Sequence, residues 1–313
     1  MAVLTVNGVT YTVTENISLM SFLRDTLRLT SVKNGCNEGA CGTCTVLIDG
    51  KAVKACVQKT DKLDGKSILT AEGLSDKERA IYVYAFSKAG AVQCGFCIPG
   101  MVICAKALLD RNPNPTRDAV KSAIKNNLCR CTGYKKIEEA ILLAAEMFRN
   151  GAVPEKSVDT GILGESTVRI DAEAKITGTA MYADDYYMEN MLYGSALRSE
   201  YPRAEILSID TSEAEKINGV ACVMTAKDIP GTQKVGHLKR DWDVLIPVGK
   251  TTHYLGDAIV LIAAETPEIL ETAKKAVKVQ YKPLQAVFSP EEAMAENAPS
   301  VHEDGNLLAY EHL

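Results

Sequence analysis

Residues 36–44 read CNEGACGTC, and a fourth thiol follows at Cys56. The cysteines stand in the order C-x4-C-x2-C…C, with three of them on one short loop. Gly35, Gly39 and Gly42 allow that loop to adopt positive φ angles and to bring its backbone close to an inorganic core. This spacing is one by which four thiolates enclose a two-iron, two-sulfur (2Fe-2S) cluster. We predict that the ligands are Cys36, Cys41, Cys44 and Cys56.

Zinc is the alternative occupant of this cysteine loop. A four-cysteine zinc site usually presents two separated C-x2-C pairs at the corners of a tetrahedron, and a five-residue step into a glycine-rich loop is unusual for it. Disulfides are a weaker alternative, since no export signal precedes the loop and tight C-x-x-C spacings favour metal ligation in a reducing compartment. The spacing therefore favours iron and sulfide over zinc.

The residues around the loop predict a small sheet crossed by one helix. Apolar and polar residues alternate on both sides of Asn7-Gly8, a dipeptide that accepts the positive φ angles of a tight hairpin turn. Apolar residues at helical spacing follow Ser18, whose hydroxyl can cap a helix, and a second hairpin turns at Asp49-Gly50. This order indicates a β-grasp, ferredoxin-like domain over residues 1–75.

A second cysteine group lies at QCGFCIPG (93–100) and CRCTGY (129–134). The surrounding pattern predicts a four-helix domain over residues 76–149, and the expected helices are 77–90, 99–111, 116–127 and 135–149. Each cysteine pair lies near a helix end, and the free N–H groups at a helix start stabilise a negatively charged cluster. The C-x2-C and C-x-C spacings alone leave zinc and a redox dithiol as alternatives.

The rest of the chain contains no pair of closely spaced cysteines. Residues 150–165 combine Gly, Pro and charges without periodicity, which predicts a linker. From 166 to 288, short β-type runs alternate with helical pieces near 211–217 and 266–275, which indicates an α/β domain. Residues 289–313 trail off in polar residues and Pro, so we expect a connector there. The predicted fold class is α+β multidomain.

The composition excludes several classes of function. The 313 residues include 35 Lys and Arg against 40 Asp and Glu, and the basic residues are scattered, so no nucleic-acid partner is expected. The amino terminus has no basic stretch followed by an unbroken apolar one, and no later run approaches the ~20 apolar residues that span a bilayer. We expect a cytoplasmic protein without a membrane partner, in which most of the ten cysteines bind metal.

Three motifs, in order, resemble signatures of the molybdenum hydroxylases, a family that includes xanthine dehydrogenases and aldehyde oxidoreductases. They are CNEGACGTC (36–44), QCGFCIPGM (93–101) and CRCTGY (129–134). The stretch VRIDAEAKITGTAMYAD (168–184) resembles the start of that family's α/β hammerhead domain. Two later stretches resemble its strands, at 254–266 and 279–284. The resemblance therefore spans nearly the whole chain.

The resemblance implies two 2Fe-2S clusters, the second of them bound by Cys94, Cys97, Cys129 and Cys131. It places the helical domain's cluster beside a molybdopterin cofactor with molybdenum, at the interface with a partner domain. The ferredoxin-like cluster would lie toward solvent or a flavin. Gln93 and Cys131 would lie closest to the pterin, where a polar group can hydrogen-bond its amino edge. The alternative for Gln93 is a helix-entry residue that bonds only local backbone.

The family's molybdenum active site is expected outside this sequence, because no segment resembles its glycine-rich molybdopterin loops. We expect a large molybdopterin-binding subunit or domain, with FAD on another subunit or a direct protein acceptor, and therefore a hetero-oligomer. The implied reaction oxidises an N-heterocycle such as a purine, or an aldehyde, with water as the oxygen source. The alternatives are a stand-alone ferredoxin-like carrier and a redox sensor, neither of which has an evident use for a hammerhead domain.

Four other features receive only structural interpretations. Cys104 and Cys222 lie in apolar runs, where a free thiol behaves as a small buried hydrophobe. Asp184 and Asp185 are adjacent, so on a strand they would point to opposite faces, and loop or edge polarity explains them better than acid–base chemistry. The histidines have no partner at metal-ligand spacing, and we assign them no role.

Overall fold

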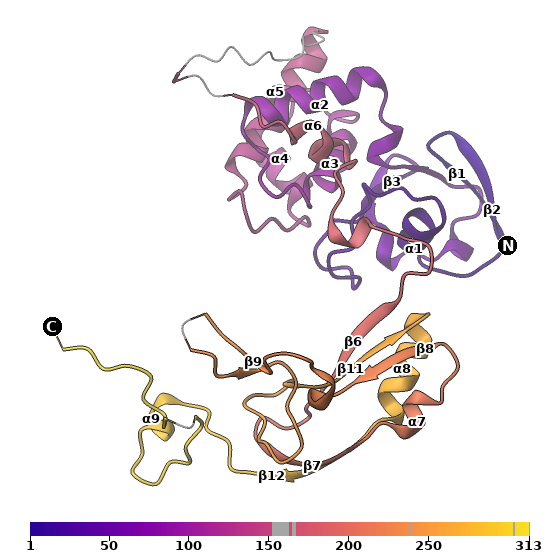
Figure 1. The fold of residues 1–313 in the computed structure, drawn as a ribbon. Helices are drawn as coiled ribbons and strands as arrows, with labels where there is room; N and C mark the ends of the chain where they lie inside the picture. Colours follow the sequence, from indigo (N-terminus) through magenta and orange to yellow (C-terminus); the bar gives the residue numbers. More distant parts are fainter. Residues whose placement is uncertain (152–162, 165–166, 238, 303, 313) are drawn as a thin grey trace. The chain divides into compact units, whose positions relative to one another are not determined.

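The structure of the protein, a computed structural model, describes residues 1–151, 163–164, 167–237, 239–302 and 304–312. The chain forms two compact units, Met1–Tyr186 and Tyr187–Leu313 (Figure 1). The expected linker at 150–165 lies for the most part outside the described residues. Among the helices of the described residues, none has the length and apolar character needed to cross a membrane.

The first unit begins with a five-stranded sheet in the order β2-β1-β5-β3-β4. Its strands are β1 (Ala2–Val6), β2 (Val9–Val13), β3 (Thr45–Ile48), β4 (Lys51–Lys54) and β5 (Ser67–Leu69). The two hairpins turn where the sequence predicted, and Asn7 and Asp49 have the positive φ angles, 49° and 48°, that tight turns require. Strand β5 joins the hairpins, since it pairs parallel with β1 and antiparallel with β3.

A helical stretch follows the first hairpin. Helix α1 (Leu19–Ser21) continues as a π-helix over Phe22–Thr26. The Ser18 hydroxyl accepts a hydrogen bond from the Ser21 N–H at 3.0 Å, as an N-cap does. Leu23 is fully buried in the core that this stretch shares with the sheet. The predicted amphipathic helix is therefore present, with a wider second turn.

Four helices form the next part of the unit, as the periodicity predicted. They are α2 (Asp76–Lys88), α3 (Ile98–Leu109), α4 (Arg117–Ile124) and α5 (Lys135–Asn150). Ser75 and Glu78 form a capping box at the start of α2. Pro99 lies in the first turn of α3, where its missing N–H costs nothing. The Thr116 hydroxyl caps α4 by accepting from the Ala119 N–H at 3.2 Å.

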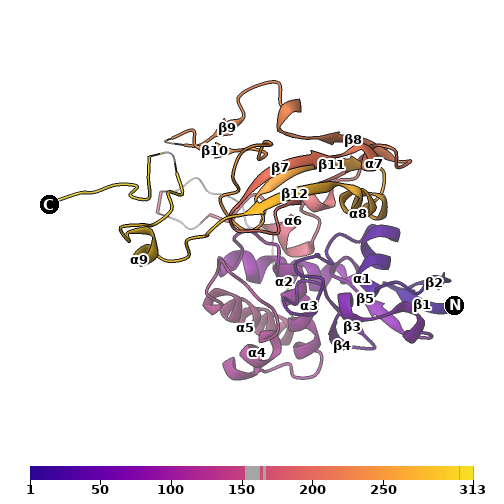
Figure 2. The same ribbon diagram turned by 90° about the horizontal axis from the view of Figure 1, so that it is seen from below.

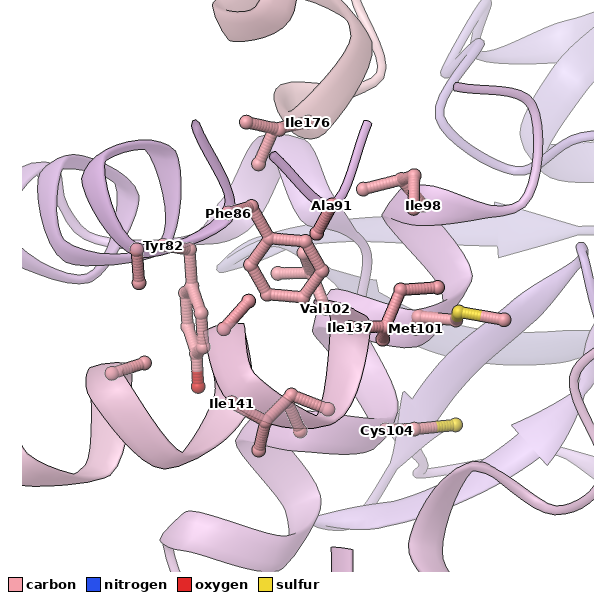
Figure 3. Close-up of a cluster of buried hydrophobic side chains, with 14 of the residues drawn as sticks. Tyr82, Phe86, Ala91, Ile98, Met101, Val102, Cys104, Ile137, Ile141 and Ile176 are labelled. Atoms are coloured by element: carbon pink, nitrogen blue, oxygen red, sulfur yellow. The ribbon is translucent and has the colours of Figure 1, made fainter. Parts of the chain in front are cut away.

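Helix α3 is buried on nearly every side, which is the expected state of a helix that is apolar all round. Figure 3 shows part of the core around it, with labelled side chains from α2, α3 and α5: Tyr82, Phe86, Met101, Val102, Ile137 and Ile141. On its other side, Ile103 and Ala107 pack with Leu47 of β3. Figure 2 shows α3 lying between the other helices and β3. This helix therefore packs the helical part of the unit directly against the sheet.

The first unit ends with residues that pack back onto both of its parts. Helix α6 (Ala172–Thr177) contributes Ala172 and Ile176 to the core of the helical part, and Figure 3 shows Ile176 there. A short 3-10 turn, Ala183–Asp185, follows. The segment that resembles the start of a hammerhead domain is thus folded against the cysteine-containing parts.

Asp185 is buried in an ion-pair cluster, with 3% of its surface exposed. One carboxylate oxygen lies 3.0 Å from a guanidinium nitrogen of Arg24, and the other lies 2.6 Å from Nζ of Lys33. The expectation that Asp184 and Asp185 only supply loop or edge polarity is wrong for Asp185. Its cationic partners lie 152 and 161 residues earlier in the sequence, and no local pattern indicates them.

The second unit consists of small sheets with short helices. A three-stranded sheet has the order β6-β11-β8, and β12 pairs with β7. The strands are β6 (Tyr193–Arg198), β7 (Ala204–Asp210), β8 (Val220–Met224), β9 (Lys234–Val235), β10 (Trp242–Asp243), β11 (Ala258–Ala264) and β12 (Lys278–Pro283). The helices are α7 (Ser212–Glu215), α8 (Pro267–Ala276) and α9 (Pro290–Ala293). Its core includes Ile206, Ile259, Ile262 and Leu270.

The two cysteines outside the motifs differ in burial. Cys104 is buried in α3, as expected, with 5% of its surface exposed. Cys222 is exposed, so the expectation of a buried hydrophobe is wrong for it. It lies on β8, which is an edge strand of the three-stranded sheet and has only one neighbouring strand in that sheet. An apolar run therefore did not ensure burial.

We predict that Asp185→Asn lowers the free energy of unfolding by about 3–5 kcal/mol, because it leaves the buried charge of Lys33 without its counterion and leaves Arg24 with only the exposed Asp184. Although burial alone would raise it, hydrogen bonds from Lys33, the Tyr182 backbone and Arg24 hold the pKa of Asp185 below its usual range. The stabilisation is therefore complete above the unfolded-state pKa of about 3.9 and is lost as pH falls through the lower folded value. Urea unfolding across this pH range measures both effects.

The matched control is Asp184→Asn. The Asp184 carboxylate also contacts Arg24, at 3.2 Å, but 59% of its side chain is exposed, so its loss should change stability by less than ~1 kcal/mol. Equal losses in the two variants would show that the buried cluster contributes no more than a surface ion pair.

Candidate metal centres

The first cysteine set is brought together by the loop before β3 and by the β3–β4 hairpin. Cys36 and Cys41 are partly exposed on the loop, whereas Cys44 and Cys56 are buried. The hairpin returns the chain so that the Ala55 N–H donates to the Cys44 carbonyl at 3.1 Å. Cys56 therefore lies beside Cys44 although 12 positions separate them in the sequence.

The second set is brought together by two loops at helix ends. Cys94 and Cys97 lie between α2 and α3, and Cys97 is the N-cap residue of α3. Cys129 and Cys131 lie between α4 and α5. Tyr134, at the start of α5 with a positive φ of 69°, accepts a hydrogen bond at its hydroxyl from the Cys129 N–H at 2.8 Å.

The eight thiols lie in pairs rather than singly. The sulfurs of Cys94 and Cys131 are 3.6 Å apart. Cys97, Cys44 and Cys36 each lie close enough to a second thiol, that of Cys129, Cys56 and Cys41 respectively, for it to influence their pKa. Among the described residues, no group of three or more His, Cys, Asp or Glu side chains is arranged to hold a single metal ion.

The electrostatics of the thiols differ with their surroundings. Backbone N–H groups of Cys41 and Glu38 lower the pKa of the Cys36 thiol to about 7. Burial raises the pKa of Cys44 to about 12 and also raises that of Cys97. Buried thiols of this kind stay protonated at neutral pH unless a bound cation displaces the proton. Paired thiols with backbone donors on an exposed rim are a donor set that suits an iron–sulfur cluster.

The loop that holds Cys36, Cys41 and Cys44 directly contacts the loop that holds Cys129 and Cys131. The Leu128 N–H donates to the Cys41 carbonyl at 2.8 Å. The buried Asn127 side chain donates to the Gly42 carbonyl at 2.8 Å. The Cys104 thiol in turn donates to the Asn127 side-chain oxygen at 3.1 Å. Residues next to Cys129 are thereby bonded to residues of the first loop.

This contact depends on Gly42. Its φ of 73° lies in the left-handed region, and a Cβ atom there would lie 2.2 Å from the carbonyl oxygen of Asn126. The first loop can therefore approach the second only where it has no side chain.

Two lysines that the sequence analysis did not single out bind carbonyls of the cysteine loops. Lys54 Nζ donates to the Gly39 carbonyl at 2.6 Å, and Lys175 Nζ donates to the Gln93 carbonyl at 3.1 Å. Gln93 and Cys131 are both exposed in the described structure. Lys54 lies two residues before Cys56, but Lys175 is far from the cysteine motifs and gives no local signal, because only the fold places it against its loop.

Comparison with known proteins agrees with this geometry. A family model described as a 2Fe-2S iron-sulfur cluster binding domain matches residues 7–84, and one described as a [2Fe-2S] binding domain matches residues 70–142. The a/b hammerhead domain of aldehyde oxidase and xanthine dehydrogenase matches residues 177–285.

Two curated relatives and one solved structure are informative. The aldehyde oxidoreductase of Megalodesulfovibrio gigas is 37% identical over 325 residues, which cover 96% of this chain and 35% of that protein. The nicotinate dehydrogenase small FeS subunit of Eubacterium barkeri is 47% identical over 136 residues, which cover 43% of this chain and 87% of that protein. The crystal structure of the Desulfovibrio desulfuricans aldehyde oxidoreductase superposes with a TM-score of 0.89 at 34% identity, and the match covers 99% of this chain and 36% of that one.

The fold and the cysteine loops thus define a protein with two 2Fe-2S binding domains followed by a hammerhead domain. The chain belongs to the molybdenum hydroxylase family of xanthine dehydrogenases and aldehyde oxidoreductases. It spans about a third of the length of the aldehyde oxidoreductase that it matches.

We predict that Gly42→Ala separates the two cysteine loops, because its Cβ would clash with the Asn126 carbonyl oxygen at 2.2 Å. The matched control is Gly50→Ala, where φ is also positive, at 77°, but no atom lies within 4 Å of the added Cβ. Both variants should lose about 1–2 kcal/mol from left-handed strain, and Gly42→Ala should lose more and retain less iron. Thermal unfolding and iron analysis measure the difference, and equal values would show that the close approach is unimportant.

Proposed function

We propose that this chain is the iron–sulfur electron-transfer part of a molybdenum hydroxylase. The two 2Fe-2S binding domains and the hammerhead domain support this, since they occur here in one chain and in the same order as in the aldehyde oxidoreductase relatives. The whole protein would oxidise an N-heterocycle such as a purine, or an aldehyde, with water as the oxygen source.

The first cluster would be bound by Cys36, Cys41, Cys44 and Cys56, and the second by Cys94, Cys97, Cys129 and Cys131. A tetrahedral metal with metal–sulfur bonds of about 2.3 Å holds two of its thiolates about 3.8 Å apart. The 3.6 Å separation of the Cys94 and Cys131 sulfurs matches that value. We therefore assign each thiol pair to one iron, so that two pairs complete each cluster.

The hydrogen bond from the Leu128 N–H to the Cys41 carbonyl is the observation that favours electron transfer between the clusters. Cys41 would bind the first cluster, and Leu128 precedes Cys129, which would bind the second. One hydrogen bond and a few backbone bonds therefore connect ligands of both centres. All-thiolate 2Fe-2S centres have low potentials and accept one electron each, so two clusters divide a two-electron oxidation into single steps.

The exposed rim of the second cluster would face the molybdopterin. Cys94, Cys131 and Gln93 are exposed in the described structure, which leaves polar and ligand atoms free to contact a cofactor held by a large subunit or domain. The molybdenum centre would supply the substrate oxidation there. The first cluster would pass electrons to FAD on another subunit or to a protein acceptor, in a cytoplasmic hetero-oligomer where thiolates stay reduced.

A stand-alone carrier or a redox sensor is the less favoured alternative. Neither needs a hammerhead domain, which the match over residues 177–285 indicates. Native purification with analysis of subunits, iron, molybdenum and flavin separates these functions. Four irons per chain with a molybdenum-containing subunit or domain would support the hydroxylase. Four irons with neither molybdenum nor a partner would instead support the carrier or sensor, and zinc in place of iron would overturn the cluster assignment.

We predict that Cys97→Ser lowers the iron content from about four to about two per chain, because it removes one ligand of the second cluster and leaves the first intact. Cys222→Ser is the control, since that thiol is exposed and lies on β8, outside both cysteine sets, and it should retain all the iron. Metal analysis and visible absorbance of the purified full chain measure both. Retention of four irons by Cys97→Ser would exclude it as a ligand.

A further inference from the structure

Residues 171–185, here called the brace, contact the Gln93–Cys97 loop and also Arg24 and Lys33, which precede the first cysteine loop in the same unit. They comprise Asp171, helix α6 and the chain that runs to the Ala183–Asp185 turn. None of them belongs to a cysteine motif. Their contacts with the Gln93–Cys97 loop have no role in the function proposed above.

Lys175 of α6 makes the first contact with that loop. Its side chain is 15% exposed, and its ammonium group bonds Asp171 at 2.7 Å and the Gln93 carbonyl at 3.1 Å. Its methylene groups pass directly over Gly95, where a Cβ would lie 2.6 Å from Lys175 Cγ. A positive charge is thereby held against the loop that contains Cys94.

Tyr182 makes the second contact. Its hydroxyl donates to the Cys94 carbonyl at 2.7 Å. Its ring packs edge to face on Phe96, with ring centroids 5.2 Å apart. A tyrosine hydroxyl keeps its proton at neutral pH, so it remains a donor to the Cys94 carbonyl.

The other end of the brace is attached to the first part of the unit. Lys33 Nζ lies 4.6 Å from the centre of the Tyr182 ring and donates to Asp185 at 2.6 Å. The Lys33 carbonyl accepts from the Thr43 hydroxyl, which lies 3.2 Å from the Cys41 sulfur. Tyr182 therefore contacts Lys33, which adjoins the first cysteine loop, while its hydroxyl bonds the Gln93–Cys97 loop.

These contacts have an electrostatic consequence for a cluster bound at Cys94 and Cys97. Reduction adds negative charge to the cluster, and hydrogen-bond donors and cations close to its ligands stabilise that charge. The Lys175 ammonium is such a cation. Its carboxylate partner, Asp171, is also bound by Arg169 at 2.8 Å, so the three groups together keep a net positive charge. The Tyr182 hydroxyl offsets the negative end of the Cys94 carbonyl dipole.

We propose that Tyr182 and Lys175 are positioning residues that hold the Gln93–Cys97 loop and raise the reduction potential of the second cluster. The inference rests on the proposed function, because it requires a cluster bound at Cys94, Cys97, Cys129 and Cys131. It adds two residues from outside the cysteine domains to the determinants of that cluster's potential.

The test is a redox titration of the full chain with its clusters, followed by electron paramagnetic resonance. Tyr182→Phe removes one hydroxyl and keeps the ring. We expect the equilibrium constant for reduction of the second cluster to fall by up to about tenfold, which is ~59 mV for a one-electron couple. Lys175→Met should lower this equilibrium constant further. Lys175→Arg should keep it near the wild-type value, since arginine keeps the charge and the donors.

Two controls accompany these variants. Tyr186→Phe changes the exposed neighbouring tyrosine, whose side chain is 58% exposed, and should leave both potentials unchanged. The first cluster, measured in the same sample, should also keep its potential. A Cys131→Ser variant identifies which signal belongs to the second cluster, because it alters that site alone.

The outcomes separate the two proposals. A wild-type chain without iron–sulfur signals would refute the proposed function. If the wild-type chain holds both clusters and the reduction potential of the second cluster is unchanged in Tyr182→Phe and Lys175→Met, the proposed role of the brace is refuted and the proposed function is not. If Tyr182→Phe or Lys175→Met loses the second cluster and retains the first, the result would support the brace as the element that holds the Gln93–Cys97 loop. If Tyr182→Phe does not accumulate, Lys175→Met and Lys175→Arg give the same readout.

Discussion

The close approach of the two cysteine loops is the constraint on which the first unit depends. The Leu128 N–H and the Asn127 side chain both bond backbone carbonyls of the first loop, and a glycine at position 42 is required for the loops to meet. Because buried backbone groups need partners, this contact fixes the register of one loop against the other. It also brings the two sets of thiols near each other. Helix α3 joins the two parts further by packing against β3.

Burial and exposure of the thiols follow from the same arrangement. In each set, some thiols lie in the core and others lie at the surface, as Cys97 and Cys131 do in the second. Core thiols resist ionisation, so a bound cation would be needed to convert them to thiolates at neutral pH. Surface thiols leave ligand atoms accessible, and an electron carrier needs such an edge to exchange electrons with a neighbour.

The brace is a third segment of the chain that contacts both parts of the first unit. Asp185 pairs with two buried cations of the first part, while Lys175 and Tyr182 bond the loop of the second. Separating the partners of a buried ion pair leaves buried charges unpaired, so these pairs oppose any arrangement that parts Asp185 from Arg24 and Lys33. The start of the hammerhead-like region is thereby made part of the iron–sulfur unit.

The sequence alone determined the features that depend on local spacing. Hairpin turns, helix caps and the cysteine motifs are each set by residues a few positions apart, and so the ferredoxin-like and helical parts were predicted correctly from them. Strand β5, with three residues, is too short for a periodic signal and exists because two hairpins flank it. Only the tertiary structure decided the burial of Asp185, the contacts of Tyr182 and the exposure of Cys222. The partners of Asp185 and Tyr182 are distant in the sequence, and the packing of whole elements brings them together. Cys222 is exposed because its strand lies at the edge of a sheet.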